Sequence, residues 1–357
     1  MNYLKFIFLL LFITSCNNDK IPYKKAELTQ SKIDSLLYKV QVEDFVRKLK
    51  YPALKNYELN KSITKHNLLK EFKLKPINEF DRDSRFDIDS FTKIIADSLN
   101  ISKSFYKADF DNNGLTDLLI IGDNQCVSGG NGSYDFSIFS FMNFGKDSII
   151  PINLIKTEDY SSFVPKITNN RNEPILQIHL PGRYHWFDKF KISKDQRVEL
   201  VYKFGTFIEF NASPKKYKIE KIELFNEHCH WKCSVFDLII NNEQHAIFNA
   251  KEGNAINENS HGPEYNSEDN IDIKGIFKAT IKKKNYDQLI NLLNYIDFPN
   301  MENSYSDGRM HSRNCTLKIT YDSGKIKNIK DYGMSGTYGL RKAYDILFDL
   351  RFNQDWE

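Results

Sequence analysis

Asp109-Phe110-Asp111-Asn112-Asn113-Gly114-Leu115-Thr116-Asp117 is a loop of acidic and amide residues that leads directly into the apolar run Leu118 to Ile121. Such a run predicts a buried β-strand, so the loop is expected at the edge of a sheet. Calcium takes about six to eight hard oxygen ligands on a flexible loop. The loop offers such ligands at alternating positions, with water completing the shell: Asp109, Asp111, Asn113, the carbonyl of Leu115 and Asp117.

The loop is not an EF-hand, because that motif needs an acidic bidentate ligand at a position that Ile120 occupies here. It resembles instead the D-x-[DN]-x-[DN]-G-x-x-D calcium loops of FG-GAP and VCBS-type β-propeller blades, which also lead into a strand. Only one copy of the loop is present, and the chain shows no repeat of a longer period. A full propeller is therefore not expected. The alternative is an Asx-rich turn without an ion, held by its own side-chain to backbone hydrogen bonds.

Length and composition predict a two-domain globular protein. The chain has 357 residues, of which 41% are hydrophobic and 14% aromatic, enough to build a substantial core. Its 50 basic and 47 acidic residues are interspersed and give a net charge of +3. Because no basic stripe is present, we expect no nucleic-acid partner.

The N-terminus predicts export and lipid attachment. Lys5 precedes an apolar stretch that ends in Ile13-Thr14-Ser15-Cys16, a pattern typical of a signal peptide over residues 1–15. Ile-Thr-Ser-Cys resembles the lipobox of bacterial lipoproteins, which implies cleavage before Cys16, acylation of that residue and a tether at 16–26. The alternative is a secretory signal with an incidental cysteine. Asn17 is not acidic, and this favours the outer membrane over retention in the inner membrane.

Residues 27–210 predict an N-terminal α+β domain of helices followed by an antiparallel sheet. Ser31 and Asp34 have the form of a capping box, so a helix is expected from Ser31 until Pro52 stops it. A second helix is expected near 91–99. Short β-rich runs then follow at 118–121, 136–144, 149–154, 175–180 and 198–210. The polar segment 211–216 is the expected domain boundary.

Residues 217–357 predict a C-terminal α+β domain with an antiparallel sheet and two helices. Residues 251–272 are rich in Glu, Asn, Ser and Gly and predict an exposed loop. Helical spacing of apolar residues predicts a helix at 286–293, ended by Pro299, and a closing helix at 340–347. Strands are expected at 222–224, 235–240, 246–248, 317–321 and 326–332.

The cysteines other than Cys16 favour disulfide chemistry in an oxidising compartment. Cys229 and Cys233 are close enough in sequence to pair across a turn, whereas the pairing of Cys126 and Cys315 stays open. The alternative is zinc, since His228-Cys229-His230-Trp231-Lys232-Cys233 holds four possible ligands. In an extended segment neighbouring side chains point to opposite faces, so tetrahedral convergence would need unusual turns.

Residues 217–357 resemble an uncharacterised family, the domain of unknown function 6438 of Bacteroidota envelope lipoproteins. The resemblance rests on 221–224, on the cysteine pair that opens the run 235–240, on 317–321 and 330–333, and on Trp356. The family pattern Gly-Cys-Phe-Gly-x-Cys-Pro is altered here, where the two cysteines remain and the residues around them differ. The resemblance implies a fold and no activity.

No catalytic motif stands out in the chain. A G-x-S-x-G elbow, an H-E-x-x-H pair, a P-loop and a Rossmann fingerprint are all absent from the sequence. The leading hypothesis is a non-catalytic binding or structural lipoprotein with a calcium-stabilised loop, attached to the membrane through its lipid and facing an envelope protein or glycan. The alternative is an envelope hydrolase with a site between the domains that uses His228 or His230. Arg183-Tyr184-His185-Trp186 could stack on a sugar or peptide, but packing is the more common role of such a cluster.

Overall fold

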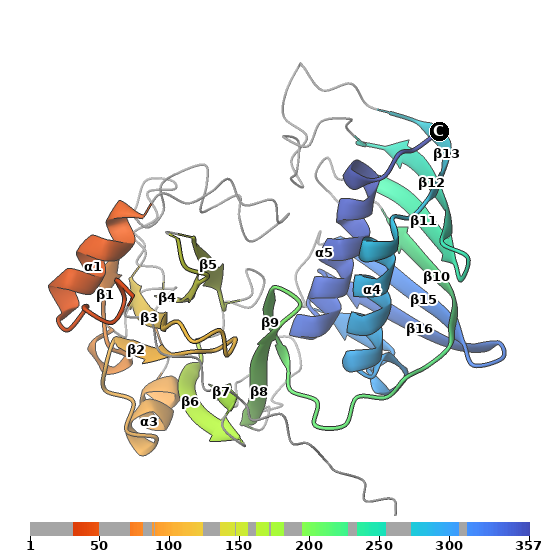
Figure 1. Ribbon diagram of the computed structural model, residues 1–357. Coiled ribbons are helices and arrows are strands. Elements are labelled where there is room, and N and C mark those ends of the chain that lie inside the picture. Colours follow the sequence, from red (N-terminus) through yellow and green to blue (C-terminus); the bar gives the residue numbers. More distant parts are fainter. Residues whose placement is uncertain are drawn as a thin grey trace, which may run out of the picture.

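The computed structural model shows an α+β fold with three sheets and four α-helices over the residues it describes (Figure 1). None of the described helices is long and apolar enough to cross a membrane. The predicted fold class is confirmed, whereas the division into two domains stays a prediction. The described residues are 31–49, 72–80, 88, 90–123, 136–146, 148–155, 162–170, 173–181, 195–227, 234–254, 273–306 and 313–357.

A five-stranded antiparallel sheet forms the first layer, with strand order β1-β3-β4-β5 and with β2 also paired to β3. All seven residues of β3 are buried. Leu118 and Ile120 pack on one side of the sheet, whereas Leu119 and Ile121 belong to the core on the other side. A continuous apolar strand therefore arises because both faces of β3 are covered. The strands are β1 (Lys73–Leu74), β2 (Phe105–Ala108), β3 (Asp117–Asp123), β4 (Phe136–Asn143) and β5 (Ile149–Asn153).

Helices α1 (Lys39–Lys48) and α3 (Ser90–Ser98), with the short η2 (Ile77–Glu79), belong to the same half of the chain. The prediction that a helix starts at Ser31 is wrong. The N–H of Ser31 does donate to Asp34 Oδ2 at 2.7 Å, but residues 32–35 form a turn and α1 begins at Lys39. The helix starts there because Gln41 Oε1 accepts the N–H groups of Leu37 and Tyr38, at 2.8 and 3.0 Å.

A four-stranded antiparallel sheet follows, with its strands in consecutive order. A single sheet in the N-terminal half was therefore the wrong prediction. A single strand over 198–210 is also wrong, because Phe204 and Gly205 take positive φ values of 56° and 82° and turn the chain into a hairpin. The strands are β6 (Val164–Asn170), β7 (Glu173–Leu180), β8 (Gln196–Lys203) and β9 (Thr206–Glu209).

The third sheet has seven strands in the order β13-β12-β11-β10-β15-β16-β14. Its strand pairs are antiparallel except for β14 with β16, which are parallel. The expected C-terminal sheet is present, but β13 and β14 were not predicted. The strands are β10 (Ile219–Asn226), β11 (Val235–Asn241), β12 (His245–Glu252), β13 (Gly275–Thr280), β14 (Ser304–Ser306), β15 (Asn314–Tyr321) and β16 (Lys325–Tyr332).

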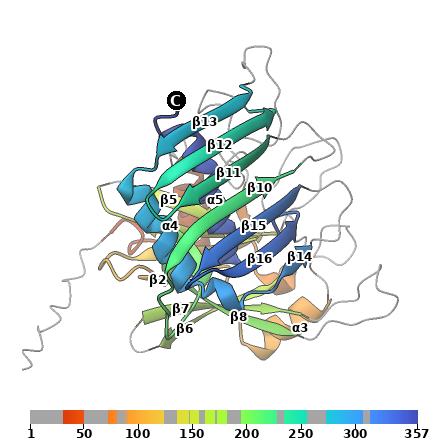
Figure 2. The same ribbon diagram turned by 90° about the vertical axis from the view of Figure 1, so that its right-hand side faces the viewer.

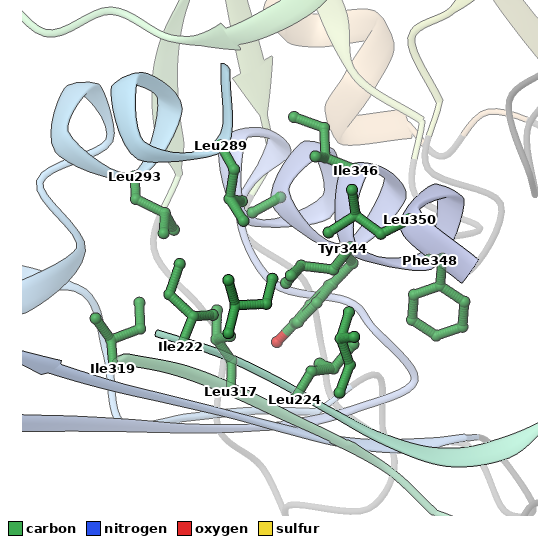
Figure 3. Packing of buried hydrophobic residues seen from close by; sticks show 14 of the residues in the cluster. Ile222, Leu224, Leu289, Leu293, Leu317, Ile319, Tyr344, Ile346, Phe348 and Leu350 are labelled. Atoms are coloured by element: carbon green, nitrogen blue, oxygen red, sulfur yellow. The ribbon is translucent and has the colours of Figure 1, made fainter. Parts of the chain in front are cut away.

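Helices α4 (Lys283–Tyr295) and α5 (Tyr338–Asn353) cover one face of this sheet, and Figure 2 shows the strands from the other side. The two predicted C-terminal helices are thus confirmed, and the short η4 (Phe298–Asn300) follows α4. Leu289 of α4 and Tyr344 of α5 point toward Leu317 on the sheet, and all three side chains are fully buried (Figure 3). Buried residues alternate with more exposed ones along β11 and β12, as expected for a sheet covered on one face.

The β8–β9 hairpin lies between the two halves of the molecule (Figure 1). Phe207 belongs to the core shared with the five-stranded sheet, whereas its neighbour Ile208 belongs to the core under α4 and α5. Glu209 Oε1 and Oε2 accept the N–H groups of Tyr338 and Gly339 at the start of α5, at 2.6 and 2.8 Å. A carboxylate at this position also complements the helix dipole. The end of β9 therefore holds α5 in place.

Candidate metal centre

The acidic loop joins β2 to β3 and carries its turn at two residues with left-handed backbone. Asn112 has φ of 57° and Gly114 has φ of 83°. Glycine and asparagine are the residues that adopt this region at low cost. The chain therefore turns sharply at these two residues.

Three carboxylates converge in this loop. Each of Asp109, Asp111 and Asp117 presents an oxygen that lies within 4.8 Å of those of the other two. Asp117 is fully buried, whereas the other two side chains are partly exposed. Among the described residues, this is the cluster of histidine, cysteine and acidic side chains that could hold a metal ion.

Asp117 ties the loop to the neighbouring strand. Its Oδ2 accepts the N–H of Phe110 and its Oδ1 accepts the N–H of Asn143 at the end of β4, both at 2.7 Å. The Asn143 side chain continues the tie, since its Nδ2 donates to the carbonyl of Thr116 at 3.2 Å. This partner was missed by the sequence analysis, because nothing local marks a residue on another strand as part of the loop.

Asp109 and Asp111 accept backbone N–H groups from inside the loop. Asp109 Oδ1 and Oδ2 take those of Asn113 and Gly114, at 3.0 and 2.8 Å. Asp111 Oδ1 takes the N–H of Asn113 at 3.2 Å. These bonds are the ones expected for an Asx-rich turn, and they also orient the carboxylates toward one another.

Asn113 is placed differently from the expectation of an oxygen ligand. Its Oδ1 accepts the N–H of Leu115 at 2.7 Å, while its Nδ2 donates to Asp111 Oδ2 at 3.0 Å and to the carbonyl of Asn143 at 2.8 Å. An ion held between the carboxylates would meet the amide nitrogen of this side chain. Asn113 would therefore have to turn its amide to become a ligand.

Burial makes the cluster electrostatically unfavourable without a cation. Burial raises the pKa of Asp111 to about 6, with a further increase from the Asp109 charge. Burial likewise raises the pKa of Asp117 to about 7, although the bonds from Asn143 and Phe110 act in the opposite direction. A divalent cation would remove the mutual repulsion of the three carboxylates. An all-oxygen donor set suits a hard ion such as calcium.

Aromatic side chains connect the loop to the β8–β9 hairpin. The rings of Phe110 and Phe207 meet edge to face with their centroids 5.2 Å apart. Tyr202 packs on Phe207 at 5.7 Å, and burial together with the charges of Asp111 and Asp117 raises the pKa of Tyr202 to about 12. The loop is thus part of the packing that reaches α5 through Glu209.

The cysteine and histidine predictions fall mostly outside the described residues. Cys16, Cys126, Cys229 and Cys233 lie there, as do His228, His230 and the cluster 183–186. Cys315 is described and buried, with its thiol donating to Asn226 Oδ1 at 3.3 Å. The disulfide and the zinc alternative therefore stay predictions.

The described histidines do not supply the arrangement expected of a hydrolase. His245 pairs with the exposed Glu243, 3.4 Å away. Burial and the charges of Arg197 and Lys166 lower the pKa of His179. In the part of the chain that the structure describes, neither histidine has a buried carboxylate among these neighbours. The hydrolase alternative thus gains no support from either of them.

Comparison with known proteins finds a family match for one part of the chain. Residues 220–351 match the family described as Domain of unknown function (DUF6438). The matched segment runs from β10 into α5 and so takes in most of the seven-stranded sheet with its two helices. Searches among curated proteins and among solved structures found no match. The predicted resemblance of the C-terminal part is confirmed, and it assigns no activity.

Proposed function

We propose that this chain is a lipid-anchored protein of the cell envelope, attached through Cys16, that acts as a non-catalytic binding or structural module. In this proposal a calcium ion stiffens the Asp109–Asp117 loop. The partner is an envelope protein or glycan, and the outer membrane is the proposed location. The lipobox-like residues 13–16 support an envelope role.

The observation that carries the calcium proposal is the convergence of Asp109, Asp111 and Asp117 within 4.8 Å. Three carboxylates at this separation repel one another, and burial opposes their ionisation. Asp117 also ties the loop to β4 through its two backbone hydrogen bonds, but those bonds do not remove the repulsion between the three carboxylates. Calcium converts the repulsion into ligation, with Leu115 and water as further oxygen donors.

Calcium is expected to raise the melting temperature of the protein. For a dissociation constant of about 10⁻⁴ M, as in extracellular modules, 10 mM calcium stabilises the folded state by about 2.7 kcal/mol. Thermal melting with and without calcium measures this as a rise of a few degrees. The matched variant is Asp111→Asn, which keeps the size of the side chain and removes one ligand charge. Its melting temperature should not respond to calcium.

The outcome against the proposal is equally specific. If the wild-type protein and Asp111→Asn melt at the same temperature with and without 10 mM calcium, the loop is a turn stabilised by its own hydrogen bonds. Magnesium serves as the ion control, because it demands a tighter octahedral shell and gives up water reluctantly. We expect magnesium at the same concentration to produce a smaller shift.

A disulfide between Cys229 and Cys233 is proposed for the segment before β11. Closing so short a loop stabilises the fold by roughly 2 kcal/mol in the chain-entropy estimate. Counting reactive thiols in the denatured protein, before and after reduction, measures it. We expect the count to rise by two on reduction, or by four if Cys126 and Cys315 also pair. An unchanged count would contradict the pairing, and bound zinc would then be measured by metal analysis.

A further inference from the structure

Three large hydrophobic side chains are exposed together at the start of α1. Leu37, Tyr38 and Val40 are 67, 68 and 67% exposed, and they fall within four consecutive residues. We call them the α1 patch. Single exposed hydrophobic residues are common on protein surfaces, whereas a contiguous group marks a contact site.

The α1 patch is held in position by the fold. Its flanking residues Leu36 and Val42 are buried in the core beneath it. The side chain of Gln41 accepts the N–H groups of Leu37 and Tyr38, which fixes the backbone at the helix start. The preceding turn is fixed as well, because Thr116 of the acidic loop donates its hydroxyl hydrogen to the Asp34 carboxylate. The patch is therefore a built surface of the molecule.

The charges around the patch are mainly positive. The exposed charged residues of segment 31–49 are Lys32, Lys39, Lys48 and Asp44. Asp44 lies one helical turn after Val40 on the same face, and its carboxylate is paired with Lys48 at 3.5 Å. Exposed aliphatic residues with a tyrosine and flanking lysines are typical of surfaces that lie at a membrane interface.

We propose that the α1 patch contacts the phospholipid surface to which the chain is anchored, with Leu37, Tyr38 and Val40 inserted at the headgroup level. The inference rests on the proposed anchoring at Cys16. Ser31 lies fifteen positions after Cys16, so full extension places Ser31 no more than about 50 Å from the lipid. The patch begins six residues later.

The small size of the patch favours a membrane over a protein partner. A stable protein interface buries about 800 Å² on each partner, far more than three side chains supply. A tethered contact needs no such area, because the anchor holds the patch at an effective concentration in the millimolar range or so. α3 also exposes Phe91 and Ile94, and Figure 1 places α1 and α3 on the side away from the seven-stranded sheet. The contact thus orients that sheet away from the membrane.

The test uses the full-length, acylated protein in phosphatidylcholine vesicles that contain brominated lipid, which quenches nearby tryptophan. Two variants each add one tryptophan: Tyr38→Trp in the patch and, as the matched control, Ile326→Trp. Ile326 is 60% exposed and lies on β16 of the seven-stranded sheet. Quenching of the added tryptophan is measured as the difference from the parent protein. We expect quenching at position 38 to exceed that at position 326 by at least about twofold.

A second arm separates the patch from the tether. Leu37→Ser and Val40→Ser are added to Tyr38→Trp, and quenching at position 38 should fall toward the level of the control. Flotation of the vesicles reports the anchor independently. If the protein floats but positions 38 and 326 are quenched equally, or the serine changes have no effect, the inference is overturned, including in favour of a protein partner. If the protein does not float, the anchoring itself is wrong and the inference falls with it.

Discussion

Replacing Asp117 with alanine is expected to lower the free energy of unfolding by about 2–4 kcal/mol in calcium-free buffer. The change removes the acceptor of two buried N–H groups, those of Phe110 and Asn143, and the alanine cannot replace it. An orphaned buried donor costs about 1–3 kcal/mol. Urea unfolding followed by circular dichroism measures the loss.

The matched control is Asp111→Ala in the same loop. Asp111 is partly exposed and accepts its hydrogen bonds from Asn113 next to it. Its removal should change the calcium-free stability by less than about 1 kcal/mol. Both variants should lose the response to calcium. Equal stability losses in the two variants would contradict the distinction between a structural Asp117 and a ligand Asp111.

The effect of Asp117→Ala is also expected to depend on pH. The folded-state pKa of Asp117, about 7, lies above its usual value of 3.8 because of burial. A raised pKa means that the folded state prefers the protonated carboxyl, so the stabilising contribution is complete below pH 3.8 and is lost as the pH rises through 7. The difference between wild type and variant should therefore shrink between pH 5 and pH 8 in the absence of calcium. A difference that grows over this range would contradict the assignment.

Replacing Glu209 with alanine is expected to cost about 2–3 kcal/mol, since charge-assisted bonds to two N–H groups are lost from the start of α5. The bonds to Tyr338 and Gly339 measure 2.6 and 2.8 Å. Glu209→Gln keeps one oxygen acceptor and should lie between wild type and alanine. Glu243→Gln is the exposed control and should leave the stability unchanged. Urea unfolding measures all three, and an unaffected Glu209→Ala variant would show that α5 does not need this cap.

The contact at Glu209 also predicts which part of the chain opens first when the Glu209 carboxylate is removed. Tyr338 donates its hydroxyl hydrogen to the carbonyl of Leu154 at 2.9 Å, so the start of α5 touches both N-terminal sheets. Tight packing continues at Gly339, where a Cβ would lie 2.4 Å from Ile296 Cγ2. Loss of the Glu209 carboxylate should therefore speed hydrogen exchange at the first turn of α5 before it affects the β-sheets.

The features that the sequence predicted well are those encoded by nearby residues. The acidic loop and its three carboxylates lie within nine residues, so their spacing alone brings them together. The amphipathic spacing of α4 and α5 is likewise local, and it identified both helices. The resemblance of the C-terminal part located the seven-stranded sheet.

The features that were missed depend on residues far apart in the chain. Asn143 joins the acidic loop only because β4 pairs with β3. In the sequence Glu209 looks like an ordinary strand residue, because its partners at the start of α5 are about 130 positions away. Gly122 gives no local signal either, yet a Cβ there would lie 2.2 Å from the carbonyl oxygen of Lys73 on β1. Tertiary contacts of this kind cannot be read from periodicity.

The start of α1 and the β8–β9 hairpin show a different cause of error. Ser31 and Asp34 do form the hydrogen bond of a capping box, but a turn satisfies that bond as well as a helix does. The run 198–210 is rich in β-branched and aromatic residues, and the turn at Phe204 uses a residue that rarely adopts positive φ. Local propensity gave way in both places to packing against neighbouring elements.

The central claim is that the Asp109–Asp117 loop holds one calcium ion, and equilibrium dialysis with radioactive calcium tests it most directly. We predict one ion bound per wild-type chain with a dissociation constant of about 10⁻⁴ to 10⁻³ M. The double variant Asp109→Asn with Asp111→Asn, which keeps the loop's side-chain sizes and the Asp117 tie, should bind none. Wild-type protein that binds no calcium, or a double variant that binds as much as wild type, would contradict the claim.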